Sequence, residues 1–144
     1  MLFRSDTFCL FHSEHDAIIF FDYLNSGQPN IRFTMGKEVN HKLHFLDVLI
    51  DNNNPNSLTS VYRKKTFSGL LTNYFSFTSF SYKVGLIKTP VDRAYKINNT
   101  WLGFHEDVTK LMDILKKNLF PAHLIERAIN RYITGTYGNH TSQG

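Results

Sequence analysis

The sequence predicts an α+β fold, in which a small antiparallel sheet with one packed helix is followed by a bundle of three helices. Apolar residues alternate with a period of two in the first half of the chain, and the period becomes 3.6 after Phe80. The composition agrees, because 144 residues with 42% hydrophobic and 15% aromatic content can bury a domain-sized core. The same composition excludes global disorder.

We expect the chain to begin with a strand and a helix. Residues 6–12 form an apolar run, which is typical of a strand buried on both faces. Ser13 is a suitable N-cap because a carboxylate follows three residues later, and Gly27 is a suitable end for the helix. Apolar residues at helical spacing define the expected inner face: Ala17, Phe20, Phe21 and Leu24.

Three further strands are expected to form an antiparallel meander. Residues 31–36 and 43–50 alternate in polarity around a polar turn, and only Asp47 interrupts the apolar character of the second run. A dense cluster of turn residues at 51–57 precedes a third alternating run at 58–64.

The second half predicts three helices. The first covers about 81–98, and Pro90 is expected to kink it or split it. The second covers about 105–119, with acidic residues at its start and lysines at its end, as the helix dipole favours. The third begins at Pro121 and is expected to stop at Gly135. The expected inner faces carry Val84, Ile87, Val91, Ala94, Tyr95, Val108, Leu111, Met112, Leu115, Ile125, Ala128, Ile129 and Tyr132.

These elements divide the chain into four segments. Residues 1–65 contain the predicted sheet, and residues 66–80 are a connector without a clear period. Residues 81–135 are the helical part, and residues 136–144 are expected to be a frayed tail.

Charge is distributed unevenly along the chain, whose net charge is +4. Residues 1–60 hold four Lys/Arg and seven Asp/Glu, a balance of −3, whereas residues 61–144 hold twelve and five, a balance of +7. A basic half of this kind favours a polyanionic partner such as nucleic acid.

Cysteine and histidine usage points away from thiol and zinc chemistry. Cys9 is the one cysteine, and we expect it to be an inert thiol within the first strand. His12 with His15 and His41 with His44 offer too few ligands for a structural zinc site. The chain has neither a secretory signal nor an apolar run of membrane-spanning length, so we expect an intracellular protein of the nucleus or cytoplasm.

The beginning of the chain contains a short motif with an aromatic residue, Phe3, two positions before Ser5 and Asp6. With this motif and several others, the chain resembles the reverse transcriptases of Penelope-like retroelements over nearly its whole length. The other motifs are Asp6-Thr7-Phe8, Ile31-Arg32-Phe33-Thr34-Met35, Leu43-His44-Phe45-Leu46-Asp47-Val48, Val61-Tyr62-Arg63-Lys64-Lys65-Thr66 and Lys83-Val84-Gly85-Leu86-Ile87, followed by Arg93-Ala94.

The resemblance implies that residues 1–65 are the end of a polymerase palm and residues 81–135 the thumb. In such enzymes two adjacent aspartates in a hairpin hold paired Mg²⁺ ions. Asp6 falls on the second aspartate, as a remnant of the catalytic and metal-binding pair, but Ser5 occupies the first. A further aspartate, the rest of the palm and the fingers would lie upstream. We therefore expect a fragment that binds no Mg²⁺ and has no polymerase activity alone.

The resemblance also gives the basic half a partner, an RNA or DNA template-primer. Seven basic residues are expected to contact its phosphates without reading bases, and neither a membrane nor a small-molecule substrate is expected. The alternative for these residues is an ordinary solvated basic face. They are Arg63, Lys64, Lys65, Lys83, Lys88, Arg93 and Lys96.

Two other interpretations remain open. Residues 105–119 and 121–134, joined at Phe120-Pro121, are also typical of a helix-turn-helix whose second helix enters a major groove. Its outer face would carry Arg127, Asn130 and Arg131, although Glu126 on the same face is unfavourable for contact with DNA. The chain could also be an interaction domain or a relic without a selected function.

Overall fold

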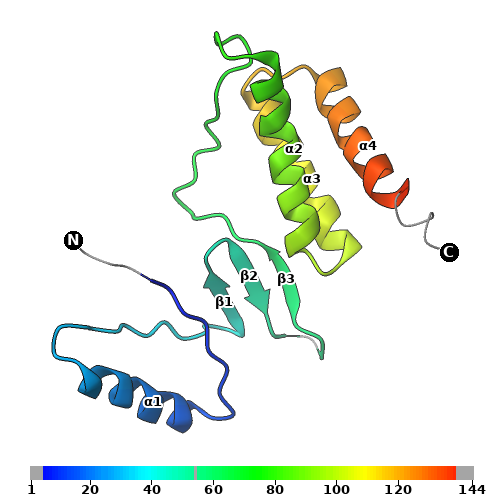
Figure 1. Cartoon of the computed structure of the whole chain (residues 1–144). Coiled ribbons are helices and arrows are strands. Elements are labelled where there is room, and N and C mark those ends of the chain that lie inside the picture. Colours follow the sequence, from blue (N-terminus) through cyan, green and yellow to red (C-terminus); the bar gives the residue numbers. More distant parts are fainter. Residues whose placement is uncertain (1–4, 54, 139–144) are drawn as a thin grey trace.

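The computed structural model describes residues 5–53 and 55–138, which are arranged as Figure 1 shows. Phe3 and the tail beyond residue 138 lie outside the described residues. The α+β class is confirmed, since a three-stranded antiparallel sheet is combined with four helices in the described part. The elements are α1 (Glu14–Gly27), β1 (Lys42–Phe45), β2 (Val48–Asp51), β3 (Leu58–Val61), α2 (Phe80–Ile97), α3 (Trp101–Lys117) and α4 (Ala122–Gly138).

The sheet lies between α1 at one end of the molecule and the three helices α2, α3 and α4 at the other (Figure 1). The hydrophobic core lies among these three helices, and β3 is the strand that contacts α2 and α3. None of the described helices is both long and apolar enough to span a lipid bilayer. The buried apolar side chains are Ile87, Val91, Ala94, Phe104, Val108, Leu111, Leu115, Phe120, Leu124, Ile125 and Ile129.

The long strand expected over 43–50 is wrong, because the chain reverses at Leu46 and Asp47. This turn divides the segment into β1 and β2, which pair with each other in an antiparallel hairpin. Leu46 has a φ of 55°, and the Asp47 carbonyl accepts a hydrogen bond from the Tyr62 N–H at 2.7 Å. The polar residue within the apolar run therefore marks the turn rather than one face of a strand.

The strands expected over 6–12 and 31–36 are also wrong, because both segments lack regular secondary structure. The side-chain amide of Asn25 accepts from the Phe33 N–H at 2.9 Å and donates to the Phe33 carbonyl at 3.4 Å. These backbone groups are thus partly satisfied by a side chain instead of a neighbouring strand. In the first segment, the Phe8 ring packs on the Phe45 ring, with centroids 5.7 Å apart.

Helix α1 begins and ends as expected. The Ser13 side chain accepts a hydrogen bond from the Asp16 N–H at 3.2 Å, and the helix ends at Gly27. However, none of its residues is buried. Three of the four expected inner residues are half-buried and the fourth, Phe20, is exposed. This helix is therefore attached to the molecule without contributing to its core.

The three C-terminal helices differ from expectation mainly at their boundaries. Helix α2 runs through Pro90 without a break. Helix α3 begins earlier than expected, because the Thr100 side chain accepts from the Gly103 N–H at 3.2 Å and caps it. Helix α4 continues past Gly135. The expected inner faces are confirmed, since all of these residues are buried or half-buried.

Candidate nucleic-acid interface

The segment 118–121 joins α3 to α4 and is held by Asn118. The buried Asn118 side chain accepts from the Leu71 N–H at 3.0 Å and donates to the carbonyls of Gly69 and Ile114, both at 2.8 Å. The Asn118 carbonyl accepts from the Tyr74 N–H at 3.1 Å. One side chain and its backbone therefore tie the segment before α2 to the end of α3.

The direction in which α4 leaves this turn depends on two further residues. Leu119 has a φ of 67°, in the left-handed region that favours glycine. The Pro121 carbonyl accepts from the N–H groups of Leu124 and Ile125 at 3.0 and 3.2 Å, which starts the helix. These contacts give α4 a defined position relative to α3.

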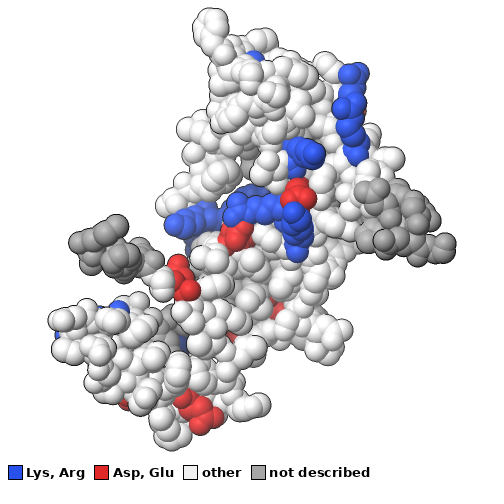
Figure 2. Space-filling view, viewed as in Figure 1, with Lys and Arg blue, Asp and Glu red and all other residues white. Residues whose placement is uncertain are grey.

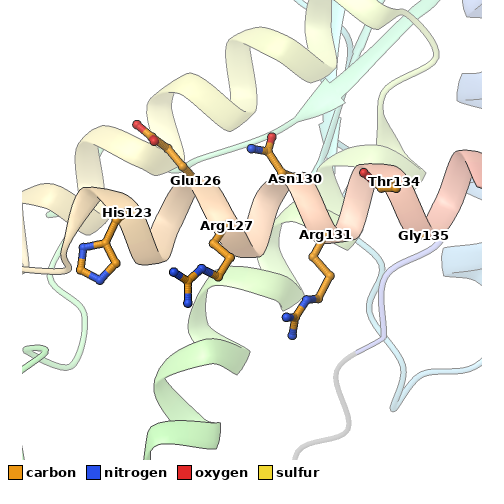
Figure 3. A pocket seen from close by; sticks show the side chains of 7 residues that line it. All are labelled: His123, Glu126, Arg127, Asn130, Arg131, Thr134 and Gly135. Carbon is orange, nitrogen blue, oxygen red and sulfur yellow. The ribbon is translucent and has the colours of Figure 1, made fainter.

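The sequence of α4 separates a buried face from an exposed one. Leu124, Ile125 and Ile129 are buried, and α4 packs mainly against α2. The opposite face is polar and forms an open surface pocket (Figure 3). We call it the α4 outer face, and it consists of His123, Glu126, Arg127, Asn130, Arg131, Thr134 and Gly135.

Two rows of side chains are visible on the α4 outer face. His123, Arg127 and Arg131 are four residues apart and point to one side of the helix in Figure 3. Glu126 and Asn130 point to the other side. Because residues i and i+4 are neighbours on a helix, each row is a continuous line of polar groups. The face thus offers guanidinium donors on one side, and an amide and a carboxylate on the other.

The arginines of this face are available for a ligand. Arg127 and Arg131 are exposed, and neither makes a hydrogen bond or an ion pair with another described residue. Glu126 is the one acid on this face. The α4 outer face therefore carries two cationic groups that no hydrogen bond or ion pair within the described residues uses.

Most of the seven basic residues predicted from the reverse-transcriptase resemblance are used inside the molecule. Arg63 pairs with Asp107 at 3.2 Å, Arg93 pairs with Asp47, and Lys96 pairs with Asp92 at 2.6 Å. Figure 2 shows basic side chains with acidic ones among them in the middle of the molecule. This mixture reduces the net positive field of that region.

The other four residues in this set differ from one another. Lys83 donates to the Ser76 carbonyl at 2.9 Å, and its ammonium group lies 5.0 Å from the centroid of the Tyr74 ring. Lys64 and Lys65 are exposed and have no ion pair within the described residues. Lys88 is also exposed and lies near Asp92. Lys64, Lys65 and Lys88 thus remain the more accessible members of the set.

Sequence reasoning missed the role of Asp107, which is one of the acidic residues expected at the start of the helix over 105–119. Its side chain is 3% exposed and accepts from the Val61 N–H at 3.1 Å, Arg63 Nη1 at 3.2 Å and Asn98 Nδ2 at 2.8 Å. The available signal was its position on the apolar face of α3, three residues after Phe104. Asp107 therefore anchors the sheet to the helices.

The free edge of β3 is covered by polar side chains from the helical part. Its outward N–H groups belong to Thr59 and Val61, which bond to Asn99 Oδ1 at 3.1 Å and to Asp107. The Thr59 hydroxyl also donates to the Ile97 carbonyl at 2.6 Å. A sheet edge satisfied in this way is closed to pairing with another strand.

Helices α2 and α4 are linked by Asp92 and Tyr132. The Tyr132 hydroxyl donates to Asp92 Oδ1 at 2.8 Å. Hydrogen bonds, first from Lys96 and then from Tyr132, lower the pKa of Asp92, and Lys88 adds a smaller electrostatic effect. Burial is the main reason that the pKa of Tyr132 is raised, with the Asp92 carboxylate next. This contact holds the second half of α4.

The residues present do not fit a paired-metal centre. Asp6 and Ser5 are exposed in a segment without regular structure. Within the described ranges, no group of three or more His, Cys, Asp or Glu side chains could hold a metal ion. His44 instead stacks on Tyr62, with ring centroids 4.3 Å apart. Cys9, expected to be buried in a strand, is exposed.

Comparison with known families agrees with the geometry of the helical part. Residues 70–130 match the family model described as animal helix-turn-helix domain, which is fewer than half of the 144 residues. The matched part contains α2, α3, the 118–121 turn and the first half of α4, including Arg127 and Asn130. No curated protein and no solved structure matches the chain.

Proposed function

We propose that this protein is a helix-turn-helix module that binds duplex DNA with the α4 outer face in the major groove. The observation that carries the proposal is the exposed trio of Arg127, Asn130 and Arg131, which follows a fixed turn and lies opposite the core. The family match over 70–130 supports it. We propose the nucleus or cytoplasm as its compartment, because DNA is present there.

The side chains of the α4 outer face suit base edges as well as phosphates. Arginine pairs with guanine through two donors, and asparagine pairs with adenine through its amide. A carboxylate such as that of Glu126 accepts from the amino group of cytosine and repels phosphate. This combination favours sequence-dependent binding over contact with the backbone alone.

Fluorescence anisotropy with labelled duplex DNA tests the proposal. We expect affinity to fall as salt rises, and a selected duplex to bind at least ~10³ times more tightly than a random one. The double substitution Arg127→Ala/Arg131→Ala should weaken binding at least ~30-fold, since each lost contact costs about 1–3 kcal/mol and the two together cost at least about 2 kcal/mol. The control Lys37→Ala/Lys42→Ala removes the same charge far from α4 and should bind normally. Equal losses in both variants would show that only net charge matters.

We propose as a second candidate that the chain is the palm end and thumb of a retroelement reverse transcriptase. The order of a small antiparallel sheet, a connector and then a helical bundle supports it, and so does the exposure of Lys64, Lys65 and Lys88. Mg²⁺ has no part in this proposal, because Asp6 lacks partner ligands in the described residues. The chain would bind a template-primer through phosphates, without preference for sequence.

The two candidates predict different sensitive residues. Binding of a primer-template that is lost in Lys64→Ala/Lys65→Ala and retained in Arg127→Ala/Arg131→Ala would favour the polymerase fragment. The reverse pattern, together with a sequence preference, would favour the helix-turn-helix module. Nucleotide incorporation by the purified chain that is lost in Asp6→Asn would contradict the expectation that the fragment is inactive.

A further inference from the structure

Two exposed apolar surfaces are not used by either proposed function. The first, which we call the α1 face, consists of Ile19, Phe20 and Tyr23; Ile19 is 54% exposed and Tyr23 is 73% exposed. The second, which we call the aromatic tip, consists of Phe75, Phe77 and Phe80. Phe75 is 75% exposed and Phe77 is fully exposed. Several exposed apolar side chains within a short segment are typical of contact surfaces.

The two surfaces carry opposite charge. Helix α1 contains Glu14, Asp16 and Asp22 and no Lys or Arg, and of these three acids Glu14 alone forms an ion pair within the described residues. By contrast, no Asp or Glu occurs in residues 52–91, which include the aromatic tip. The α1 face is therefore an apolar surface beside the exposed carboxylates of Asp16 and Asp22, whereas Lys37 neutralises Glu14.

Lysines lie close to the aromatic tip. Lys83 donates to the Ser76 carbonyl at 2.9 Å. Lys116 and Lys117 are in the last turn of α3, directly before Asn118, whose carbonyl bonds to the Tyr74 N–H. The aromatic tip is therefore an apolar surface with three lysines nearby and one acid, Asp113, a turn before Lys117. It is complementary to the α1 face in apolar character and in its excess of positive charge.

The two surfaces lie at opposite ends of the molecule, so they cannot meet within one chain in this conformation (Figure 1). We propose that the α1 face of one copy binds the aromatic tip of a second copy. Pairing of two α1 faces would bring like charges together, whereas the head-to-tail contact places carboxylates beside lysines. A contact between two different surfaces continues into a chain of molecules unless its rotation closes a ring.

Complementation of two variants tests this contact by light scattering after size-exclusion chromatography and by sedimentation velocity. Wild-type protein should gain mass as its concentration rises. Ile19→Ser/Tyr23→Ser removes one surface and Phe75→Ser/Phe77→Ser removes the other, and each should raise the dissociation constant at least ~10-fold. Mixing these two variants should produce a 1:1 dimer that grows no further, because each retains one intact surface. Leu102→Ser, at an exposed site outside both surfaces, should assemble like the wild type.

Several outcomes would overturn the proposal. These are a wild-type protein that stays monomeric at all concentrations, a mixture that stays monomeric, and an assembly that is lost only in the α1 variant. A tip variant that loses DNA binding while assembly persists would assign the aromatic tip to nucleic acid instead. If association does not weaken as salt rises from about 0.05 to 0.5 M, attraction between the carboxylates of α1 and the lysines near the aromatic tip does not hold the two copies together, which contradicts the proposal.

Charge exchange provides a second test if a serine variant fails to fold. Asp16→Lys/Asp22→Lys and Lys116→Glu/Lys117→Glu alter only exposed groups, and far-UV circular dichroism checks their folding. Each variant alone should be monomeric, because like charges then face each other at the contact. A double variant that carries both changes should assemble again, and failure to do so would count against the proposed pairing.

Discussion

The helical part and the first third of the chain differ in where their apolar side chains lie. Every buried hydrophobic side chain of the described residues lies between Ile87 and Ile129, whereas α1 buries none. Both regions are rich in aliphatic and aromatic residues, so composition does not explain the difference. The difference arises from the packing of neighbouring elements. Helices α2, α3 and α4 cover one another's apolar faces, whereas the apolar side chains of α1 are at most half-buried. Stability should therefore be concentrated in α2, α3 and α4.

The largest expected effect is a cavity in the core. Leu115 is fully buried, and Leu115→Ala should cost about 2–5 kcal/mol in the free energy of unfolding. Ile19→Ala on α1 should change it by less than about 0.5 kcal/mol. Urea unfolding measures both values, and hydrogen exchange should show earlier opening of α1 than of α3. Equal costs would mean that α1 shares the core.

Asp107→Ala should break the junction between the sheet and the helical part at a cost of about 3 kcal/mol, which is the low end of the cost of removing one partner of a buried ion pair. The loss would leave the Val61 N–H, the Arg63 guanidinium and the Asn98 amide without their acceptor. In NMR spectra, the amide chemical shifts of the sheet residues should change more than those of α4. Asp113→Ala, at another acid of α3, is the matched control.

Asn118→Ala should cost about 2 kcal/mol, because its side chain makes three hydrogen bonds in a buried position. The variant should also loosen the segment 69–74 and with it the direction of α4, so DNA affinity should fall along with stability. Thermal unfolding and anisotropy measure the two effects. A variant with full DNA affinity would show that the turn does not position α4.

The opposite sign is expected at the neighbouring residue. Leu119 has a φ of 67° and an exposed side chain, so Leu119→Gly should stabilise the protein by about 0.5–1 kcal/mol. The gain should appear as a higher urea concentration at the midpoint of unfolding, with an unchanged dependence of the free energy of unfolding on urea. Destabilisation by this substitution would indicate that the Leu119 side chain has contacts that outweigh its backbone strain.

The smallest effect is a pH dependence of the contact between α2 and α4. The pKa of Asp92 is lowered in the folded state, so its contribution is present above the unfolded pKa and is lost as pH falls through the folded one. The pKa of Tyr132 is raised, so its contribution is present below the unfolded pKa and is lost as pH rises through the folded one. Both Asp92 and Tyr132 should therefore contribute to the free energy of unfolding between about pH 4 and pH 10.

Asp92→Asn tests this dependence by urea unfolding at a series of pH values. The free energy of unfolding should fall less steeply at acidic pH than in the wild type, because the substituted amide does not titrate. Asp22→Asn on α1 serves as the control, since that exposed acid has no contact with α4. If Asp92→Asn loses stability at acidic pH as steeply as the wild type does, other carboxylates determine that loss.

The sequence predicted those elements whose signal is local. Helical spacing identified the inner residues of α2, α3 and α4, such as Ile87, Leu115 and Ile125, and all three are buried. Ser13 as an N-cap is likewise confirmed, and the connector expected over 66–80 is irregular up to Ser79, since Phe80 begins α2. The outer position of Arg127, Asn130 and Arg131 followed from the same period, because residues opposite a buried stripe must face solvent.

What only the tertiary structure decided are the contacts between segments distant in sequence. A strand requires a partner edge, so the apolar run at 6–12 and the alternating run at 31–36 had the composition of strands without becoming strands. The pairing of Arg63 with Asp107 and of Arg93 with Asp47 joins residues more than forty positions apart, which no local pattern reveals. Local spacing therefore determined the helices and the face of α4, whereas long-range pairing determined which charges remain free to bind a partner.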